Sequence, residues 1–195
     1  MIAIIHLTMR HSREEKAASH ERIVAVAAAR IREAGTDQPG VAEIMKAAGL
    51  THGGFYKHFA SREELIDEAV GRAMVDSEPL IAALAAEADD PMAAFIDAYL
   101  SEEHRDDRGT GCGVAALGND IARLGPASQE AYRAQVQRYR EQLQPLLGGD
   151  DDEDARRRAA ATVSAMVGAL TIARALGPTP ESDAFLRDVR QSLHG

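Results

Sequence analysis

The sequence predicts an all-α fold, and three observations support this prediction. Apolar residues recur three and four positions apart along most of the chain, as they do on one face of a helix. The composition is rich in alanine and contains only 4% aromatic residues, which favours helices packed at close range. No segment alternates apolar and polar residues as a strand does, and the sequence shows no internal repeat.

Length and charge limit the class of protein further. The chain has 195 residues, enough for one large or two small domains. Its net charge of −9 comes entirely from the second part: residues 1–75 hold 10 basic and 10 acidic residues, whereas residues 76–195 hold 12 and 21. No apolar run reaches the roughly 20 residues that span a bilayer, so we expect no membrane association. The single cysteine excludes an intrachain disulfide and fits a reducing cytoplasm, where we expect the protein to be located.

The first helix is expected from about Lys16 to Ala34, after an N-terminal arm. Its inner face is predicted to carry three apolar residues, Ile23, Ala27 and Ile31. Gly35 suits the position that ends a helix. After a turn at residues 36–40, Gly40 must serve as the N-cap of the next helix, although glycine offers no side chain for that purpose.

Residues 41–59 are predicted to form two short helices joined by a tight turn. Apolar residues recur at helical spacing at Val41, Ile44 and Met45. The turn follows at residues 47–50, where Gly49 takes a positive φ without strain.

The second of these helices is predicted to have one face directed to the core and one directed outward. Thr51 is a good N-cap for it. Phe55 and Phe59 are four residues apart, so they share one face and anchor the helix, and a phenol, an ammonium and bare glycine backbone face the other way. This pattern is typical of a helix-turn-helix that enters the DNA major groove.

A longer run of residues is specific to one family. The segments AAGLT at 47–51, GFY at 54–56, HF at 58–59 and SREEL at 61–65 stand in the order found there. From about His20 to Met74 the chain resembles the DNA-binding domain of the tetracycline-repressor-like (TetR) family of transcriptional regulators. The resemblance implies a homodimeric, all-helical repressor that binds double-stranded operator DNA and responds to a small-molecule effector. Past residue 75 it covers only the general layout.

The family's usual start lies just before the first helix. We therefore expect Met9 to be the true start, with residues 1–8 an extension that lacks the features of a signal peptide. The alternative is an ordered arm that packs on a neighbour. The expected domains are an arm at 1–15, a helix-turn-helix domain at 16–77 and a helical effector-binding and dimerisation domain at 78–195.

The candidate DNA contacts combine the resemblance with the chemistry of the side chains. Lysine neutralises phosphate or donates to guanine, and tyrosine and threonine hydroxyls donate to phosphate oxygens. An arginine at a helix start, beside free backbone N–H groups, also suits a phosphate. The predicted DNA-binding residues are Thr51, His52, Gly53, Tyr56, Lys57, His58 and Arg62.

The elements of the second part are predicted from caps and breakers. Ser61 and Glu64 form a capping box that opens a helix linking the two domains. The segments expected to follow are a short helix at Leu80–Ala88 after Pro79, a helix opened by Asp90-Pro91, a polar loop at Glu102–Gly113, helices at Val114–Leu124 and Ala127–Leu147 separated by Gly125-Pro126, and two last helices ending near Leu176 and Leu193.

The last two helices are the expected dimer interface. Acids at the start of the first one stand four residues before arginines, in the pairs Asp152–Arg156, Glu153–Arg157 and Asp154–Arg158, which we interpret as helix-stabilising ion pairs and not as a site. Small residues four apart then line this helix, at Ala161, Ala165, Ala169 and Ala173. Two such helices from each of two chains would form a four-helix interface.

The effector pocket is expected where bulky residues interrupt the alanine-rich body. The candidates are Phe95, Tyr99, Leu117, Ile121, Tyr132, Val136, Tyr139 and Met166. Each of them is equally consistent with an ordinary residue of the hydrophobic core. Cys112 is a redox candidate, because Arg105 and Arg108 precede it and a nearby cation lowers a thiol's pKa. The alternative for Cys112 is a small buried residue at a helix start.

Other classes receive less support from the sequence. No histidine, cysteine or acid cluster has metal-ligand spacing, and no catalytic arrangement stands out, so we expect no metal, no cofactor and no enzyme. Two alternatives to an effector-released repressor remain: a thiol-based regulator acting through Cys112, and a helical module that has lost DNA binding. Tyr56 and Lys57 argue against the second.

Overall fold

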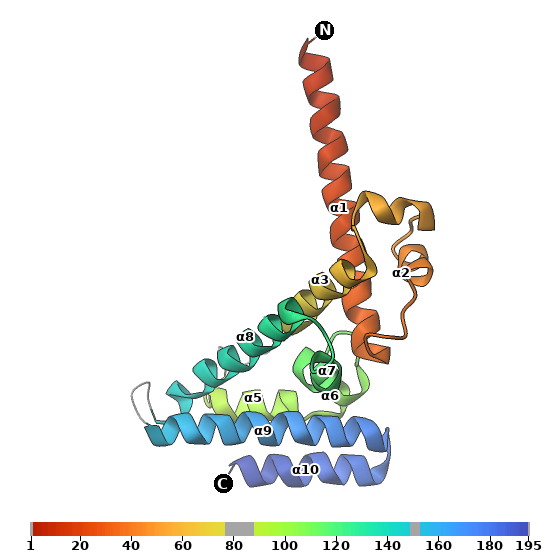
Figure 1. Ribbon diagram of the computed structural model, residues 1–195. Coiled ribbons are helices and arrows are strands. Elements are labelled where there is room, and N and C mark those ends of the chain that lie inside the picture. The colour runs from red at the N-terminus through yellow and green to blue at the C-terminus, as the bar shows by residue number, and fades with distance from the viewer. Residues whose placement is uncertain (1, 77–87, 149–152, 195) are drawn as a thin grey trace.

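Every regular element that the computed structural model describes is helical, in agreement with the predicted fold class (Figure 1). The structure describes residues 2–76, 88–148 and 153–194. The elements are α1 Ile2–Ala34, α2 Val41–Ala47, the 3₁₀ helix η1 His52–Lys57, α3 Arg62–Val75, α5 Pro91–Tyr99, α6 Glu102–Asp106, α7 Gly113–Ile121, α8 Pro126–Leu143, the 3₁₀ turn η2 Pro145–Leu147, α9 Glu153–Leu176 and α10 Pro180–His194.

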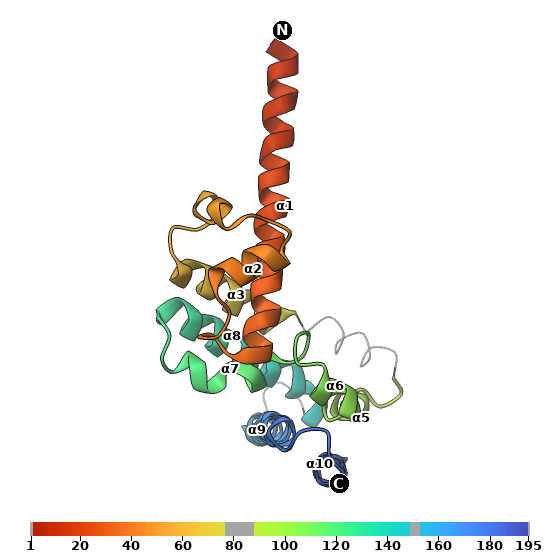
Figure 2. The same cartoon turned by 90° about the vertical axis from the view of Figure 1, so that its right-hand side faces the viewer.

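α1 is longer than the sequence led us to expect. We placed its start near Lys16, but the helix begins at Ile2, because the preceding stretch contains neither glycine nor proline to interrupt it. Its first turns extend beyond the rest of the molecule (Figures 1 and 2). The predicted inner face is correct, since Ile23, Ala27 and Ile31 are all 0% exposed. Gly35 ends the helix with a φ of +84°, as predicted.

α3 connects the two parts of the chain. The Ser61 hydroxyl accepts a hydrogen bond from the Glu64 backbone N–H at 3.2 Å, as a capping box requires. The Glu64 carboxylate reaches the Ala60 N–H at 2.5 Å, one residue before the position expected for it. The helix packs against α1 on one side and α7 and α8 on the other. An added Cβ on Gly113 would lie 2.4 Å from the Ala73 carbonyl oxygen, so only glycine lets α7 begin this close to α3.

The segment between α5 and α7 is more ordered than predicted. The Asp90 side chain caps α5 at the Ala93 N–H, 3.0 Å away, as expected. Glu102–Gly113 was expected to be a loop, but its first part is α6. This short helix forms because the Ser101 hydroxyl accepts from the His104 N–H at 3.1 Å and caps its start. The predicted helix at Leu80–Ala88 lies almost wholly outside the described residues.

α8, α9 and α10 complete the second part. α8 begins at Pro126, one residue before the predicted start at Ala127. It stops at Leu143, and not at Leu147, because Pro145 cannot continue an α-helix and starts the turn η2 instead. α9 and α10 run antiparallel side by side below the other helices (Figure 1). Two of the three predicted ion pairs are present, Glu153–Arg157 at 3.1 Å and Asp154–Arg158 at 3.2 Å. The third involves Asp152, which is outside the described residues.

α9 is the one described helix whose length and composition would let it cross a membrane. It packs against α10, α8 and α5, and 44% of its most apolar window is buried in the fold. Core helices of globular proteins have the same composition, so this feature does not indicate a membrane span.

Candidate functional site

η1 is held to the core by Phe55, which belongs to it, and by Phe59, which follows it two residues later. Phe55 and Phe59 are each 2% exposed, and their rings stack with centroids 5.5 Å apart. His20 of α1 stacks on Phe59 at 4.6 Å. The predicted inward face is therefore correct, and the anchoring directs the opposite face of η1 away from the molecule.

The outward face of η1 carries the residues that the sequence assigned to DNA. The Tyr56 ring is 76% exposed, the largest exposure among the bulky apolar side chains described. Thr51, His52, Gly53 and Lys57 are exposed beside it. We call these five residues the η1 ridge. It offers a phenol, an ammonium, a hydroxyl and an imidazole, all of which donate hydrogen bonds to phosphate or base edges.

Gly53 has no structural reason to be glycine. Its φ is not positive, and an added Cβ would meet no atom within 4 Å. A glycine in a helix costs about 1 kcal/mol relative to alanine. An approach by another molecule to this backbone would account for the residue.

η1 is a 3₁₀ helix and not the α-helix that the spacing suggested. Thr51 stands at its N-cap position, as predicted, but its side chain makes no capping hydrogen bond. Two consecutive glycines, Gly53 and Gly54, lower the preference for a regular α-helix, which explains the tighter and shorter form.

His58 and Arg62 lie beside the ridge and make contacts inside the protein. The His58 ring is half-buried, and its pKa is lowered by burial and then by the charges of His20 and Lys16, so the neutral form is favoured. Its Nδ1 is buried without a hydrogen-bond partner. Arg62 donates to the Thr36 carbonyl oxygen at 2.5 Å and ties the start of α3 to the turn before α2. No sequence pattern indicates this contact, because the two residues are 26 positions apart. DNA binding by His58 or Arg62 stays a prediction.

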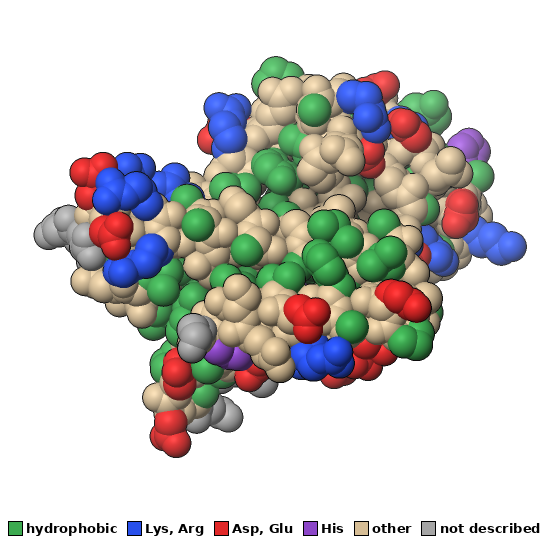
Figure 3. Space-filling view, turned by 90° about the horizontal axis from the view of Figure 1, so that it is seen from below, with side chains coloured by type: hydrophobic (Ala, Val, Ile, Leu, Met, Phe, Trp, Pro, Cys, Tyr) green, Lys and Arg blue, Asp and Glu red, His purple; other side chains and the backbone are tan. Residues whose placement is uncertain are grey.

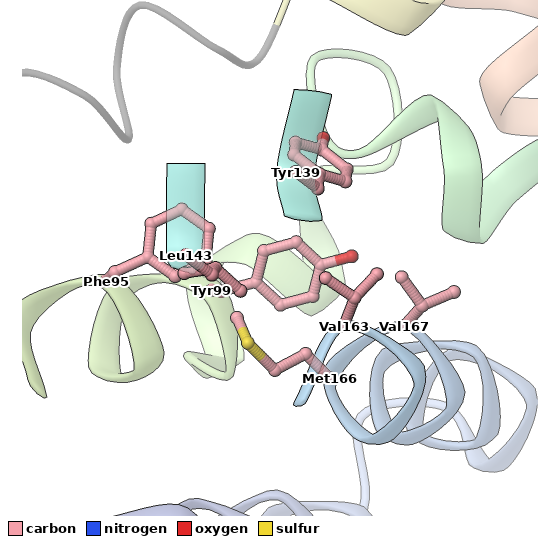
Figure 4. A pocket seen from close by; sticks show the side chains of 7 residues that line it. All are labelled: Phe95, Tyr99, Tyr139, Leu143, Val163, Met166 and Val167. Atoms are coloured by element: carbon pink, nitrogen blue, oxygen red, sulfur yellow. The ribbon is translucent and has the colours of Figure 1, made fainter. Parts of the chain in front are cut away.

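The second candidate site is a small apolar cavity among α5, α8 and α9 (Figure 4). Four of the eight predicted residues line it: Phe95, Tyr99, Tyr139 and Met166. The Tyr99 ring lies in the middle, between residues of α8 and α9, and burial raises its pKa. The cavity volume of about 10 Å³ holds about one water molecule, so no larger effector fits while the cavity is closed.

The other four predicted pocket residues do not line this cavity. Leu117 and Ile121 are buried in the core, and Val136 is half-buried against it. Tyr132 lines a separate groove beside α7. The cavity also includes three residues that the sequence analysis missed, Leu143, Val163 and Val167. Helical spacing from Tyr139 and Met166 was the signal that would have found Leu143 and Val163.

Cys112 is wholly buried, with its Sγ 3.5 Å from the Tyr139 hydroxyl. Its backbone N–H donates to His104 Nε2 at 3.0 Å. Arg105, expected to be a nearby cation, is instead engaged by Asp106 and Asp183. The thiol therefore lies in the environment of a buried core residue.

Comparisons with known proteins agree with this geometry. The family model described as bacterial regulatory proteins, tetR family, matches residues 23–69, which include α2, η1 and the start of α3. No curated protein sequence gives a significant match.

Solved structures match over nearly the whole chain. A TetR transcriptional regulator from Chloroflexus aurantiacus is 28% identical, with a TM-score of 0.79 over 92% of this chain and 94% of that one. Escherichia coli NemR in its reduced form is 17% identical, with a TM-score of 0.75 over 90% of this chain and 95% of that one. A TetR-family regulator from Cytophaga hutchinsonii is 16% identical, with a TM-score of 0.76 over 93% and 96%. The last two likenesses concern the fold alone. Residues 23–69 therefore form a DNA-binding domain of the tetR family of bacterial regulatory proteins, in a chain whose fold resembles that of solved TetR regulators over nearly its whole length.

Proposed function

We propose that this protein binds a palindromic operator in double-stranded DNA as a homodimer, represses transcription there, and is released by a small-molecule effector. The observation that carries the proposal is the η1 ridge. Because Phe55 and Phe59 are buried, Tyr56 and Lys57 are held outward on a short helix that fits the major groove. A protein of this kind acts on chromosomal DNA, so we place it in the cytoplasm.

The homodimer is proposed to form through α9 and α10. The face of α9 away from the core exposes Ile172 (47%) and Leu176 (45%), and apolar side chains form a band across this side of the molecule (Figure 3). Pairing of this face with a second copy would bury it. The two η1 ridges would then enter major grooves about one helical turn, roughly 34–36 Å, apart.

Effector binding is proposed to act through α3. The helix contacts α1 in the DNA-binding part and α7 and α8 in the second part, so a displacement of α7 or α8 by a bound effector would reach the helix-turn-helix through it. An effector shifts this equilibrium only if it binds the DNA-free form more tightly than the DNA-bound form.

The test begins with selection of duplexes from a randomised pool by the purified protein. Fluorescence anisotropy on the selected duplex then compares wild type with Lys57→Ala and Tyr56→Phe. We expect each variant to bind at least about tenfold more weakly, since each loses a charged or hydroxyl contact, with no change in thermal stability. Arg133→Ala, at an arginine on α8 whose side chain is 68% exposed, is the control and should bind as wild type does. Equal affinities for all four proteins would refute the proposed interface.

A thiol-based regulator remains the second candidate. One similar fold, NemR, was solved in a reduced form, and Cys112 lies beside the Tyr139 hydroxyl and His104. Its full burial argues against direct oxidation. Peroxide should weaken DNA binding by wild type and not by Cys112→Ser if the thiol is the trigger; identical responses of the two would exclude it.

A further inference from the structure

Two open hollows meet where α1, α7 and α9 approach one another. The larger, of about 490 Å³, is bounded by the end of α1, by α7 and by α9. The smaller, of about 300 Å³, lies between the segment that follows α6 and the end of α9. Arg108 and Arg174 line both hollows, so we treat the pair as one site and call it the arginine groove.

Positive charge exceeds negative charge around the arginine groove. Four arginines line it, against two carboxylates, Glu33 and Asp106. Both carboxylates are already paired: Glu33 with Arg30 at 3.0 Å and Asp106 with Arg105 at 2.7 Å. A third lining arginine, Arg32, pairs with Asp76 at 2.9 Å. Arg108 and Arg174 make no ion pair with any residue that the structure describes.

Arg174 is the more buried of these two cations. It donates from Nη2 to the His104 carbonyl oxygen at 3.0 Å and from Nε to the Arg105 carbonyl oxygen at 3.3 Å, while its Nη1 is buried without a hydrogen-bond partner. A buried donor of a charged group that lacks a partner is costly, so an acceptor would stabilise it. The nearby Asp107 carboxylate accepts from the Thr110 hydroxyl at 2.5 Å and makes no ion pair with Arg174 in the described structure.

The pKa values of the neighbouring arginines reflect this difference. The hydrogen bond to Asp106 raises the pKa of Arg105. Burial is the main reason that the pKa of Arg174 is lowered, and the charge of Arg108 acts in the same direction, against opposing contributions from Cys112, Tyr99 and Asp107. Two cations that act on each other across an open groove form a place for an anion.

We propose that the arginine groove binds the carboxylate of an acidic effector, a proposal that rests on the effector-responsive function above. Arg108 and Arg174 would hold the carboxylate, since guanidinium groups bind it through paired hydrogen bonds. The remainder of the effector would lie against Val114, Ala115 and Val167, which line the larger hollow.

The groove is also connected to the DNA-binding part of the chain. Arg32 of α1 donates from Nε to the Gly109 carbonyl oxygen at 2.6 Å, next to Arg108. The Thr36 N–H, just after α1, donates to Asp120 of α7 at 2.9 Å. A carboxylate that draws Arg108 inward moves the segment that α1 holds, and so acts on the helix-turn-helix.

Calorimetric titration of the full chain with matched acid and amide probes tests the proposal. The probes are hexanoate, benzoate and 1-naphthoate, each compared with its own uncharged amide. We expect at least one acid to bind about tenfold or more tightly than its amide, because only the acid pairs with the arginines. Arg108→Gln and Arg174→Gln should each weaken that acid about tenfold. Arg157→Gln, at an exposed arginine near the opposite end of α9, should not change it.

Arg108→Gln is the decisive variant, because its exposed side chain makes no hydrogen bond in the described structure, whereas Arg174 holds α6 in place. No binding by any of the three acids, equal binding of acids and amides, or acid binding unchanged in Arg108→Gln would overturn the proposal. DNA binding is measured separately. If the protein binds its selected duplex but none of the acids, the proposed DNA-binding function stands and the proposed carboxylate site is refuted. If it binds an acid but no DNA, the carboxylate site stands and the DNA-binding function is refuted.

Discussion

At the scale of single residues, the proposed DNA-binding surface depends on neighbouring residues that point in opposite directions. Phe55 is buried and fixes the orientation of η1, while Tyr56 and Lys57, the next two residues, remain in solvent. Gly53 leaves its backbone bare on the same surface. Neither packing nor backbone conformation requires a glycine there, so we propose that its role is to let DNA approach.

Gly53→Ala is therefore expected to separate stability from binding. The substitution should raise the free energy of unfolding by up to about 1 kcal/mol, through helix propensity, and weaken DNA binding about tenfold by blocking close approach. Thermal melts and anisotropy on the selected duplex measure the two effects. Gly71→Ala in α3 is the matched control, since its added Cβ also meets no atom within 4 Å. If Gly53→Ala binds as tightly as Gly71→Ala, the close-approach explanation is wrong.

At the scale of elements, His104 joins three helices of the second part. Its Nδ1–H donates to the Tyr99 carbonyl oxygen at the end of α5, 2.7 Å away, and its Nε2 accepts from the Cys112 N–H at the start of α7, 3.0 Å away. The ring itself belongs to α6. Only the neutral imidazole can make both bonds at once, since the protonated ring has no acceptor. Burial is the main reason that the pKa of His104 is lowered, which keeps this form.

The stability of this connection should depend on pH. Because the pKa of His104 is lower in the folded chain than the ordinary value near 6.5, the unfolded chain takes up the proton first as the pH falls. The free energy of unfolding is then unaffected above about pH 6.5 and decreases below it, until the folded-state pKa is reached.

Urea titrations between about pH 5 and pH 8 measure this effect by comparing wild type with His104→Gln. The variant should show a shallower acid-side loss and, at pH 8, a destabilisation of about 1–2 kcal/mol from altered hydrogen bonds. The lowered pKa of His58 acts in the same direction in both proteins, so the difference between the profiles reports His104 alone. Parallel profiles would show that His104 does not contribute.

At the scale of the whole molecule, the proposed DNA-binding and dimerising surfaces lie at different ends. The segment between α2 and α3, which holds the η1 ridge, lies beside α1 in Figure 1, and α9 and α10 form the base, with α3 and α8 between them. In the proposed dimer, the spacing of the two ridges would therefore be set by a surface at the opposite end from the DNA. A small rotation at α9 would displace η1 further than α9 itself because of this separation.

Ile172→Glu is expected to separate the two copies. A carboxylate on the exposed apolar face of α9 would be desolvated in the proposed interface, which costs several kcal/mol for an unpaired charge. Sedimentation analysis should show a monomer, and affinity for a palindromic duplex should fall at least about tenfold. Leu146→Glu is the control, at a leucine that is 43% exposed in η2 and outside this face. A stable Ile172→Glu dimer would place the interface elsewhere.

The sequence alone determined the features that depend on neighbours along the chain. The all-α class, the inward phenylalanines, the Asp90 cap and the break at Pro126 are set within a few residues, by helical periodicity and by the loss of a donor at proline. The order of residues in the helix-turn-helix was specific enough to indicate the family before any coordinates.

Tertiary structure decided the features that depend on residues distant in sequence. It placed four of the eight pocket candidates around a cavity and the other four elsewhere, because periodicity identifies a buried face but not which helix covers it. It also showed the Arg105 guanidinium engaged by Asp183, 78 residues away in sequence. The arginine groove is of the same kind: Arg108 and Arg174 are unremarkable in sequence, and only packing brings two unpaired cations to one opening.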